Sequence, residues 1–570
     1  MFNLRRIGMT KKWKFYDIDQ EKANRIKNKL KISELLSEIL VNRNVKTEEE
    51  ARIFLNPTRN DFYDPFLFKD MDIAVDRIIK AIEEKEKVVI YGDYDVDGIT
   101  STTVLKQFLE ERGLKADTYI PNRLDEGYGL NKDAIDIIAN NKNTLIITVD
   151  CGISGIKEIE YARTLGIETI VTDHHEAGEV LPNAIAVIDA KRKDNTYPFR
   201  GLAGVGVVFK VIQAISKKLE LEEKEYLKYL DLVCVGTISD IVPLVGENRV
   251  IAKLGLKLVQ VTKNLGLKTL IQTIGYQKID SNAVSFGIAP RINACGRMGH
   301  EEEALKLFLS KDIEEVQKIA EKLNEYNRLR QEIEKKIYEE AIQKIQKEQM
   351  EKNSSIVVAG ENWHHGVIGI VSSKVTDLYF KPSILLGIEG DIAKGSGRSI
   401  PGFDLHDALC ECGECLEKYG GHEMAVGLSL KKENLIPFQQ KFEAIAKQHK
   451  IEEIIPELWI DKQITLKDMT KEVMQDLEQL EPFGEGNKLP LFFYKNLKID
   501  SIRALSEGKH IKLTLKDTNY IINVIGFNLG YLTNEYLIGD RVDIVGNLEI
   551  NHYNGTDTIQ INLKDMRKSY

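Results

Sequence analysis

The stretch VVIYGDYDVDGITST, residues 88–102, decides the fold. It opens on four apolar residues rich in β-branched side chains, turns at Gly92, and leads into a helix-like segment over 99–112. Another helix-like segment, 72–84, precedes it. Short apolar runs bounded by helices predict βαβ units around a buried parallel sheet.

Three further apolar runs continue this pattern at 144–150 (TLIITVD), 168–173 (ETIVTD) and 184–189 (AIAVID). Acidic residues and histidines lie at the carboxyl ends of the runs at 88–91, 144–150 and 168–173. Because the carboxyl ends of parallel strands meet in one crevice, we expect these side chains to converge. They are Asp93, Asp95, Asp97, Asp150, Asp173, His174 and His175.

Several carboxylates in one crevice repel each other, so a cation must compensate their charge. Oxygen ligands with a few imidazoles suit Mn²⁺ or Mg²⁺, and the histidines favour Mn²⁺. A site with two such ions activates water and stabilises a phosphoryl transition state. The spacing of Asp93, Asp95 and Asp97 also resembles a calcium loop. Val104, however, stands where that loop requires glutamate. The cluster therefore predicts a metal-dependent phosphoesterase.

The segments GDYDVDG (92–98), VDCG (149–152), TDHH (172–175) and GTISDIVPL (236–244) resemble the four motifs of the DHH phosphoesterase superfamily. The resemblance adds Asp240 and implies a pair of divalent ions, Mn²⁺ or Mg²⁺. It implies catalytic roles for His175, Asp93 and Asp95, which would orient the attacking water or accept its proton. The metal ligands that it implies are Asp93, Asp95, Asp97, Asp150, His174 and Asp240.

Segments of the second half resemble the RecJ branch of that superfamily, at 286–299, 362–374, 395–409, 420–427 and 482–492. This implies an α/β fold in which a long helix joins a parallel-sheet DHH domain to a smaller α/β DHHA1 domain. An all-β OB-fold domain follows, as the short β-rich runs at 509–515, 520–527, 541–550 and 557–563 also indicate. The expected boundaries are an extension packed on the DHH domain (1–70), the DHH domain (71–302), a connecting helix (303–352), the DHHA1 domain (353–455) and the OB-fold domain (456–570).

The RecJ branch consists of exonucleases that degrade single-stranded DNA from its 5′ end to mononucleotides, in DNA repair and recombination. The guanidinium of arginine binds phosphate through two parallel hydrogen bonds, and glycine-rich segments let the backbone approach a phosphate closely. A lone arginine is more often a surface ion pair, and His422 equally fits a core histidine. By resemblance, the residues expected to bind the 5′-phosphate or the neighbouring backbone are Arg123, Arg291, Arg297, Ser396, Arg398 and His422.

The net charge of −9 over 570 residues argues weakly against nucleic-acid binding, although metal-binding carboxylates contribute to it. No apolar run reaches the roughly 20 residues of a membrane helix, so we expect a cytoplasmic monomer without membrane contact. The resemblance implies a helicase and a single-strand-binding protein as partners. Two alternatives stay open: a DHH hydrolase of short oligonucleotides or cyclic dinucleotides, and a non-catalytic RecJ-like scaffold.

Three features of the second half allow more than one interpretation. The helical pattern over 303–350 predicts a connecting helix rather than a partner-binding coiled coil. Residues 403–421 look like one amphipathic helix, on which Cys410 and Cys412 face apart. We therefore expect packed or partly exposed thiols without a metal, rather than a zinc site with Cys415, His406 and His422. Aromatic residues available to stack on bases in the OB-fold groove are Phe492, Phe527, Tyr531 and Tyr553.

Overall fold

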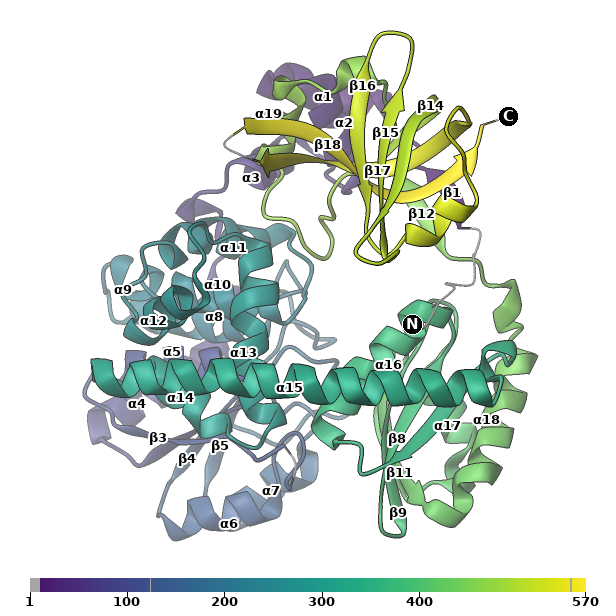
Figure 1. Cartoon of the computed structure of the whole chain (residues 1–570). Coiled ribbons are helices and arrows are strands. Elements are labelled where there is room, and N and C mark those ends of the chain that lie inside the picture. Colours follow the sequence, from purple (N-terminus) through teal and green to yellow (C-terminus); the bar gives the residue numbers. More distant parts are fainter. Residues whose placement is uncertain (1–10, 124, 554–555, 570) are drawn as a thin grey trace. The chain divides into compact units, whose positions relative to one another are not determined.

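The computed structural model describes residues 11–123, 125–553 and 556–569, apart from the side chains at 553 and 556. The chain forms two compact units. One holds Arg52–Gln331 together with Glu481–Lys488, and the other holds the rest of the described chain. Figure 1 shows the elements of both units. None of the helices in the described ranges is long and apolar enough to span a membrane.

The first unit is built on a sheet of five parallel strands in the order β3-β2-β4-β5-β6. The predicted parallel sheet is therefore confirmed. The chain moves from β2 to β3 on one side and then to β4 on the other, so the strand order reverses between β2 and β4. Ligands of open α/β sheets bind at this point. The strands are β2 (Val88–Tyr91), β3 (Ala116–Tyr119), β4 (Leu145–Val149), β5 (Glu168–Thr172) and β6 (Ala186–Ile188).

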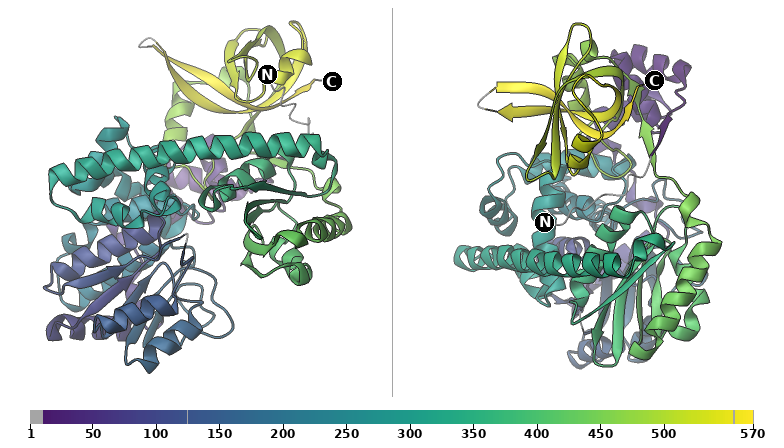
Figure 2. Two further views of the ribbon diagram at one scale, coloured as in Figure 1. Left: turned by 60° about the horizontal axis from the view of Figure 1, so that its bottom comes forward. Right: turned by 45° about the vertical axis from the view of Figure 1, so that its right-hand side comes forward.

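Helices cover both faces of this sheet (Figure 2). Side chains of a strand alternate between faces, so Val88 and Ile90 enter the larger core with α4, α5 and α8. Val89 and Tyr91 enter the opposite core with α6 and α7. These helices are α4 (Met71–Glu84), α5 (Val96–Glu110), α6 (Lys132–Asn140), α7 (Ile156–Thr164) and α8 (Gly204–Lys218).

The remainder of the first unit is helical and surrounds the larger core. A π-helical stretch, Ala283–Ile288, leads directly into α13. The sequence predicted one helical stretch over 303–350, and the structure has α14 and then α15, separated by 310–312. α3 (Glu48–Leu55) spans the boundary between the two units. The other helices are α9 (Lys224–Leu227), α10 (Leu230–Ser239), α11 (Gly246–Val259), α12 (Leu265–Ile274), α13 (Ala289–Arg297), α14 (Glu301–Leu309) and α15 (Ile313–Lys347).

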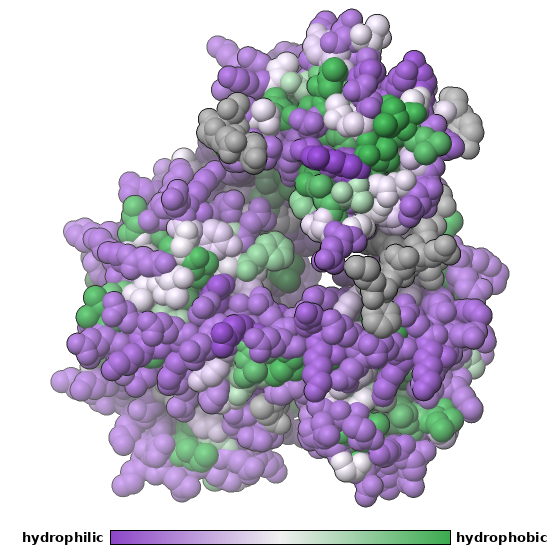
Figure 3. All heavy atoms as spheres, in the orientation of Figure 1, coloured by the Kyte–Doolittle hydropathy of each residue, from purple (hydrophilic) through white to green (hydrophobic). Residues whose placement is uncertain are grey.

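α15 continues into the second unit, where the DHHA1 region has a mixed sheet in the order β10-β11-β9-β8-β7. Figure 3 shows mainly hydrophilic side chains along α15. The other helices are α16 (His365–Tyr379), α17 (Leu405–Glu411) and α18 (Leu435–Gln448). The strands are β7 (Ile356–Glu361), β8 (Ser383–Glu389), β9 (Ile392–Arg398), β10 (Lys418–His422) and β11 (Ala425–Lys431).

The single helix predicted over 403–421 is wrong. α17 ends at Glu411, and Gly420 and Gly421 lie in β10, which forms a hairpin with β11. The local apolar spacing suits a helix, but β10 is stabilised by backbone pairing with β11, which a local pattern does not reveal.

The OB-fold expectation is confirmed, because β14 pairs with both β15 and β17 and so closes a barrel. The predicted β-runs all lie in its strands. A short helix, α19 (Lys471–Gln479), precedes the barrel. The strands are β13 (Lys462–Gln463), β14 (Phe492–Leu505), β15 (His510–Lys516), β16 (Ile521–Gly526), β17 (Arg541–Tyr553) and β18 (Thr556–Lys568).

Residues 11–51 of the expected extension belong to the unit that contains the barrel. β1 (Lys12–Phe15) pairs in parallel with β12 (Glu457–Ile460), and the Trp13 indole donates to Asp565 (2.7 Å). After α1 (Gln20–Leu30) and α2 (Glu34–Asn42), Arg43 donates to both Asp461 oxygens (2.7 and 3.3 Å). These contacts join residues more than 400 positions apart, so no local pattern predicts them.

Candidate metal centre and phosphate-binding residues

The carboxylates and histidines that the motifs predicted do converge at the carboxyl ends of β2, β4 and β5. His174 Nε2 lies 3.0 Å from Asp150 Oδ1, 3.6 Å from Asp240 Oδ2 and 3.8 Å from Asp97 Oδ2. In three groups, one ligand atom per residue lies within 4.8 Å of the others. The groups are Asp93 with Asp95 and Asp150, Asp97 with His174 and Asp240, and Asp150 with His174 and His175.

Backbone at the start of two helices fixes the carboxylates of the first motif. Asp95 is the N-cap of α5 and accepts from the Gly98 N–H (3.0 Å). Asp97 accepts from the Gly204 and Val205 N–H groups that begin α8 (2.6 and 2.8 Å). A Cβ on Gly204 would lie 2.6 Å from Asp150 Oδ1, so glycine lets α8 approach both aspartates.

The side chains present fit divalent cations. Asp93 Oδ1, Asp150 Oδ1 and Asp240 Oδ2 are buried and accept no hydrogen bond. Buried carboxylate oxygens without donors are costly unless a positive charge meets them. Six carboxylate and imidazole side chains from four strand or helix ends provide the hard donor set that Mn²⁺ and Mg²⁺ prefer.

The pKa values of these side chains also indicate that the protein itself does not compensate the negative charge of the cluster. Burial, and then repulsion from neighbouring aspartates, raises the pKa of Asp93, Asp150 and Asp240 and raises that of Asp97 to about 7. Burial, and then the charge of His175, lowers the pKa of His174 to about 3. His174 is therefore neutral at physiological pH, which is the form that binds metals.

His175 lies in a different electrostatic environment. Its Nδ1 is 2.7 Å from Asp173 Oδ1, and Asp173 also accepts from the backbone of Ile153 (2.9 Å) and His174 (2.7 Å). Burial lowers the pKa of His175, but the hydrogen bond and charge of Asp173 outweigh it and raise the pKa. His175 thus stays protonated to a higher pH than an ordinary histidine.

Sequence reasoning missed two residues beside this cluster. The Tyr128 hydroxyl lies 3.1 Å from His175 Nδ1 and donates to the Asp150 carbonyl (3.2 Å). Asp189 follows β6, and burial raises its pKa to about 7. The end-of-strand position of Asp189 matches that of Asp150 and would have identified it, whereas Tyr128 gives no sequence signal apart from its place in a glycine-rich loop.

Arg123 lies in the loop after β3, close to the metal cluster. Its guanidinium stacks over the Tyr94 ring (4.9 Å). Burial raises the pKa of Asp93 and Tyr94, and the charge of Arg123 offsets part of that rise. Arg297, at the end of α13, acts electrostatically on the same tyrosine. The structure therefore brings both predicted arginines to the first motif.

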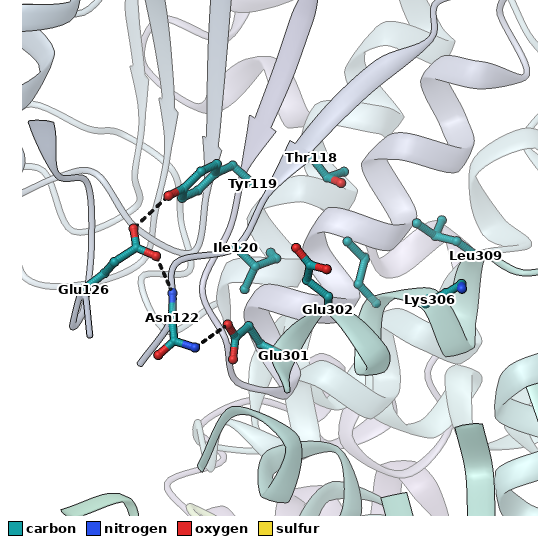
Figure 4. Close-up of a pocket in the computed structure, with 10 residues that line it drawn as sticks. Thr118, Tyr119, Ile120, Asn122, Glu126, Glu301, Glu302, Lys306 and Leu309 are labelled. Atoms are coloured by element: carbon teal, nitrogen blue, oxygen red, sulfur yellow. Dashed lines mark hydrogen bonds between the residues drawn. The ribbon is translucent and has the colours of Figure 1, made fainter. Parts of the chain in front are cut away.

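A pocket of about 550 Å³ lies beneath the loop that carries Arg123, between β3 and α14 (Figure 4). Glu126 accepts from the Asn122 N–H, the Tyr119 hydroxyl and the Asn131 amide, each at 2.8 Å. Asn122 in turn donates to the buried Glu301 (3.0 Å). These bonds brace the loop that presents Arg123 and Tyr128.

Arg291 is tied into the fold. Its guanidinium donates to Asn324 of α15 (3.0 Å) and to the Gly287 carbonyl (2.8 Å), and burial lowers its pKa. These bonds occupy part of the fork that a phosphate would use, so Arg291 has weaker support as a phosphate ligand than Arg123.

Ser396, Arg398 and His422 lie in the second unit, on one face of the DHHA1 sheet. Arg398 pairs across the sheet with Ala425, which pairs with His422. Arg398 Nη1 donates to Ser396 Oγ (2.9 Å), and a Cβ on Gly369 of α16 would lie within 3.2 Å of both side chains. The structure therefore brings Ser396 and Arg398 together beside α16, and His422 lies two strands away on the same face.

The cysteines of the second half show no metal geometry. Cys412 and Cys415 are buried, while Cys410 is exposed with its Sγ 3.8 Å from His406 Nδ1. Among the described residues, the groups that could hold a metal all lie in the first unit. Of the barrel aromatics, Phe492 is buried and Phe527 is half-exposed beside His510. The side chain of Tyr553 lies outside the described residues.

This parallel-sheet fold, with clustered carboxylates and histidines at its strand ends, defines a DHH-type phosphoesterase. Family models match in the same order as the domains: the DHH family N-terminal domain over 87–237, the DHHA1 domain over 353–448 and the RecJ OB domain over 460–565.

Two curated relatives show the particular family. The chain is 40% identical over 560 residues to the single-stranded-DNA-specific exonuclease RecJ of Bacillus subtilis, covering 97% of this chain and 70% of that one. It is 32% identical to the RecJ of Salmonella typhimurium, covering 87% and 90%. The chain belongs to the RecJ family.

Solved structures agree with this assignment. The structure of RecJ from Thermus thermophilus in complex with Mn²⁺ matches with a TM-score of 0.86 at 28% identity, over 98% of this chain and 80% of that one. A structure of exonuclease RecJ bound to manganese matches with a TM-score of 0.61 at 32% identity, over 68% and 97%.

Proposed function

We propose that this chain is a metal-dependent exonuclease that degrades single-stranded DNA from its 5′ end and releases mononucleotides. The observation that supports it most is the buried convergence of Asp93, Asp150 and Asp240, whose oxygens lack hydrogen-bond donors around the neutral His174. The B. subtilis and S. typhimurium relatives are named single-stranded-DNA-specific exonucleases. The role in DNA repair and recombination, beside a helicase and a single-strand-binding protein and as a monomer, rests on the family resemblance alone.

In this proposal the metal ligands are Asp93, Asp95, Asp97, Asp150, His174 and Asp240. When bound to these residues, a pair of Mn²⁺ or Mg²⁺ ions would supply Lewis acidity, which would acidify water and offset charge on the phosphoryl oxygens. The α8 backbone holds Asp97, and the α5 N-cap bond holds Asp95, so neither carboxylate must reorganise as substrate arrives.

His175 donates a hydrogen bond to the phosphoryl group as negative charge develops there. Its raised pKa supports this role over that of a base. Asp173 accepts from the backbone of Ile153 and His174 as well as contacting His175, and it is not among the proposed metal ligands. It therefore keeps His175 oriented and protonated when ions neutralise Asp93 and Asp97.

In this proposal each unit contributes residues that bind DNA. Arg123 and Arg297 bind backbone phosphates near the metal cluster, and Ser396, Arg398 and His422 bind the terminal 5′-phosphate. The barrel adds a surface on which bases stack. Its exposed apolar residues include Tyr520, Ile521 and Phe527, and Figure 3 shows hydrophobic side chains at the barrel surface.

The experiment that tests this function is digestion of 5′- and 3′-labelled single and double strands with Mn²⁺. We expect the 5′ label to leave first as a mononucleotide and the duplex to resist. Release from the 3′ end, or equal cutting of duplex, would contradict the proposal. Faster turnover on dinucleotides than on long strands would instead support a hydrolase of short oligonucleotides.

Replacing Arg398 with alanine should slow digestion of 5′-phosphorylated strands by about 10- to 100-fold. A charge-assisted hydrogen bond contributes about 1.5–3 kcal/mol. Strands with a 5′-hydroxyl should lose much less, which initial rates on the two substrates will show. The charge-preserving Arg398→Lys should recover only part of the rate, because lysine lacks the fork.

The matched control for this variant is Lys447→Ala, which removes one exposed positive charge from α18 of the same domain. It should leave the preference for a 5′-phosphate unchanged. If Arg398→Ala slows both substrates equally, the residue does not read the terminal phosphate.

A further inference from the structure

Residues 481–488, EPFGEGNK, form a segment that leaves one unit and packs in the other. The chain before it, α19, and the chain after it, β14, belong to the unit with the barrel. The segment itself belongs to the unit with the metal cluster. We call it the docking segment. By this assignment it shares a compact unit with the DHH domain.

The docking segment contacts the residues that directly follow Asp240. The Leu244 N–H donates to the Glu485 carbonyl (2.7 Å), and Leu244 is buried. A Cβ on Gly484 would lie 2.6 Å from Leu244 Cδ1. A Cβ on Gly486, whose φ is +71°, would lie 3.1 Å from Pro243 Cβ. A side chain at either position would therefore press on the side chains of Leu244 or Pro243.

The DHH domain holds the docking segment in a fixed conformation. Gly484 and Asn487 exchange backbone hydrogen bonds (3.0 and 3.2 Å), and the Ser281 hydroxyl donates to the Phe483 carbonyl (2.7 Å). The buried guanidinium of Arg249 donates to the carbonyls of Pro482 (3.2 Å) and Glu481 (3.1 Å). A buried guanidinium needs such acceptors, so this arrangement is strongly specified.

The backbone next to Asp240 needs this kind of support. Ile241 has a φ of +62° and a side chain 72% exposed, so its own packing does not hold it there. A β-branched residue rarely adopts this left-handed conformation and keeps it only where its surroundings fix it. The docking segment fixes the chain from Pro243 onward, only three residues beyond Asp240.

Asp240 depends on that backbone for its position. Its Oδ2 is buried, accepts no hydrogen bond and lies 3.6 Å from His174 Nε2. By contrast, Asp97 and Asp95 accept bonds from backbone N–H groups. Asp240 ends α10, where its N–H donates to the Gly236 carbonyl (3.0 Å), so α10 fixes its backbone on one side and the chain from Ile241 onward must fix it on the other.

We propose that the docking segment is a positioning element of the metal centre, which sets the place of Asp240 through its contacts with Pro243 and Leu244. This inference rests on the metal-dependent function proposed above and adds residues 484–486 to that function. A contact that only anchored the barrel would affect stability and leave metal affinity unchanged.

The test is calorimetric titration of the metal-free, full-length protein with Mn²⁺, comparing the wild type with Gly486→Ala. The added methyl group pushes on Pro243, so we expect one Mn²⁺ to bind about 10- to 100-fold more weakly, the usual effect of disturbing a ligand's support. The nuclease rate should recover at high Mn²⁺ concentration. The thermal unfolding temperature without metal should change no more than in the control.

The matched control is Gly275→Ala. Gly275 lies in the same unit with a φ of +85°, and nothing lies within 4 Å of its added Cβ. Alanine at this position therefore carries a similar free-energy cost of a positive φ without contacting 240–246. Asp240→Asn gives the reference for loss of this ligand. If Gly486→Ala lowers the unfolding temperature further, Ser281→Ala, which removes one bond to the docking segment, replaces it.

The outcomes separate this inference from the proposed function. Wild-type affinity in Gly486→Ala or its replacement, with weakened binding in Asp240→Asn, overturns the positioning role and leaves the metal centre intact. No Mn²⁺ binding by the wild type overturns the metal centre itself. Weakened binding in Gly275→Ala as well would mean that strain anywhere in the unit affects the ions, which also overturns the inference.

Discussion

Replacing His174 with alanine is expected to lower hydrolysis of single-stranded DNA by roughly 1,000-fold or more while the protein stays folded. Lewis-acid stabilisation of the transition state contributes several kcal/mol, and about 4 kcal/mol corresponds to three decades in rate. His174 Nε2 lies within 3.8 Å of three carboxylates. Two of the three candidate metal-binding groups include His174, so its replacement removes a ligand from both. Single-turnover rates at saturating Mn²⁺ measure the effect.

The choice of His174 over Asp95 follows from the structure. Asp95 caps α5, so Asp95→Ala would also cost about 1 kcal/mol of helix stability. Asp95→Asn keeps an acceptor for the Gly98 N–H while removing the charge, and should also lose most activity. His449→Ala, at the exposed end of α18, serves as the matched histidine control. Near-normal turnover of His174→Ala would mean that the metal-ligand assignment is wrong.

Removing metal should make the stability of the protein fall as pH rises from about 4 to about 7. Folding raises the pKa of Asp93, Asp97, Asp150 and Asp240, and it lowers that of His174 to about 3. The four carboxyls outweigh the one imidazole, so the folded state binds more protons than the unfolded state in this range. The free energy of unfolding therefore decreases with pH until the folded carboxyls have titrated, at about 7 for Asp97. A tenfold difference in proton affinity between the folded and unfolded states corresponds to about 1.4 kcal/mol.

The measurement is thermal unfolding of the chelated protein at pH 5 and pH 8, with and without Mn²⁺. We expect a lower unfolding temperature at pH 8 without metal and the larger stabilisation by Mn²⁺ at that pH. Titration in two buffers of different ionisation enthalpy should show protons released on binding. Asp93→Asn removes one buried charge and should flatten the pH dependence. A metal-free protein that is equally stable at both pH values would contradict the raised pKa values.

Much of the candidate site could be predicted because its signal is local. Each ligand group directly follows an apolar run, and the parallel pairing of those runs brings their ends to one edge. Six of the predicted residues of the DHH motifs occupy one cluster for this reason, whereas Asp240 ends α10 and was predicted only from the family resemblance. The β-rich runs of the tail likewise correspond to strands β15 to β18.

Other features required contacts between distant parts of the chain. The pairing of β1 with β12, the tie between Arg291 and Asn324, and the Tyr128 contact with His175 join segments without a shared local pattern. At 403–421 the local pattern was itself misleading. The apolar residues there have helical spacing, but the end of this stretch forms strand β10, which pairs with β11. Tertiary pairing energy outweighs local propensity at such places.

The sequence by itself determined the parallel sheet, the order of the domains and the side chains that meet at the ends of the strands, because these follow from period, spacing and motif order along the chain. Only the tertiary structure decided how those side chains are held and charged. It showed α8 donating to Asp97, Asp173 raising the pKa of His175, and residues 481–488 packed against the chain beyond Asp240. Burial and close backbone contact arise only when distant segments pack, so no single stretch of sequence contains them.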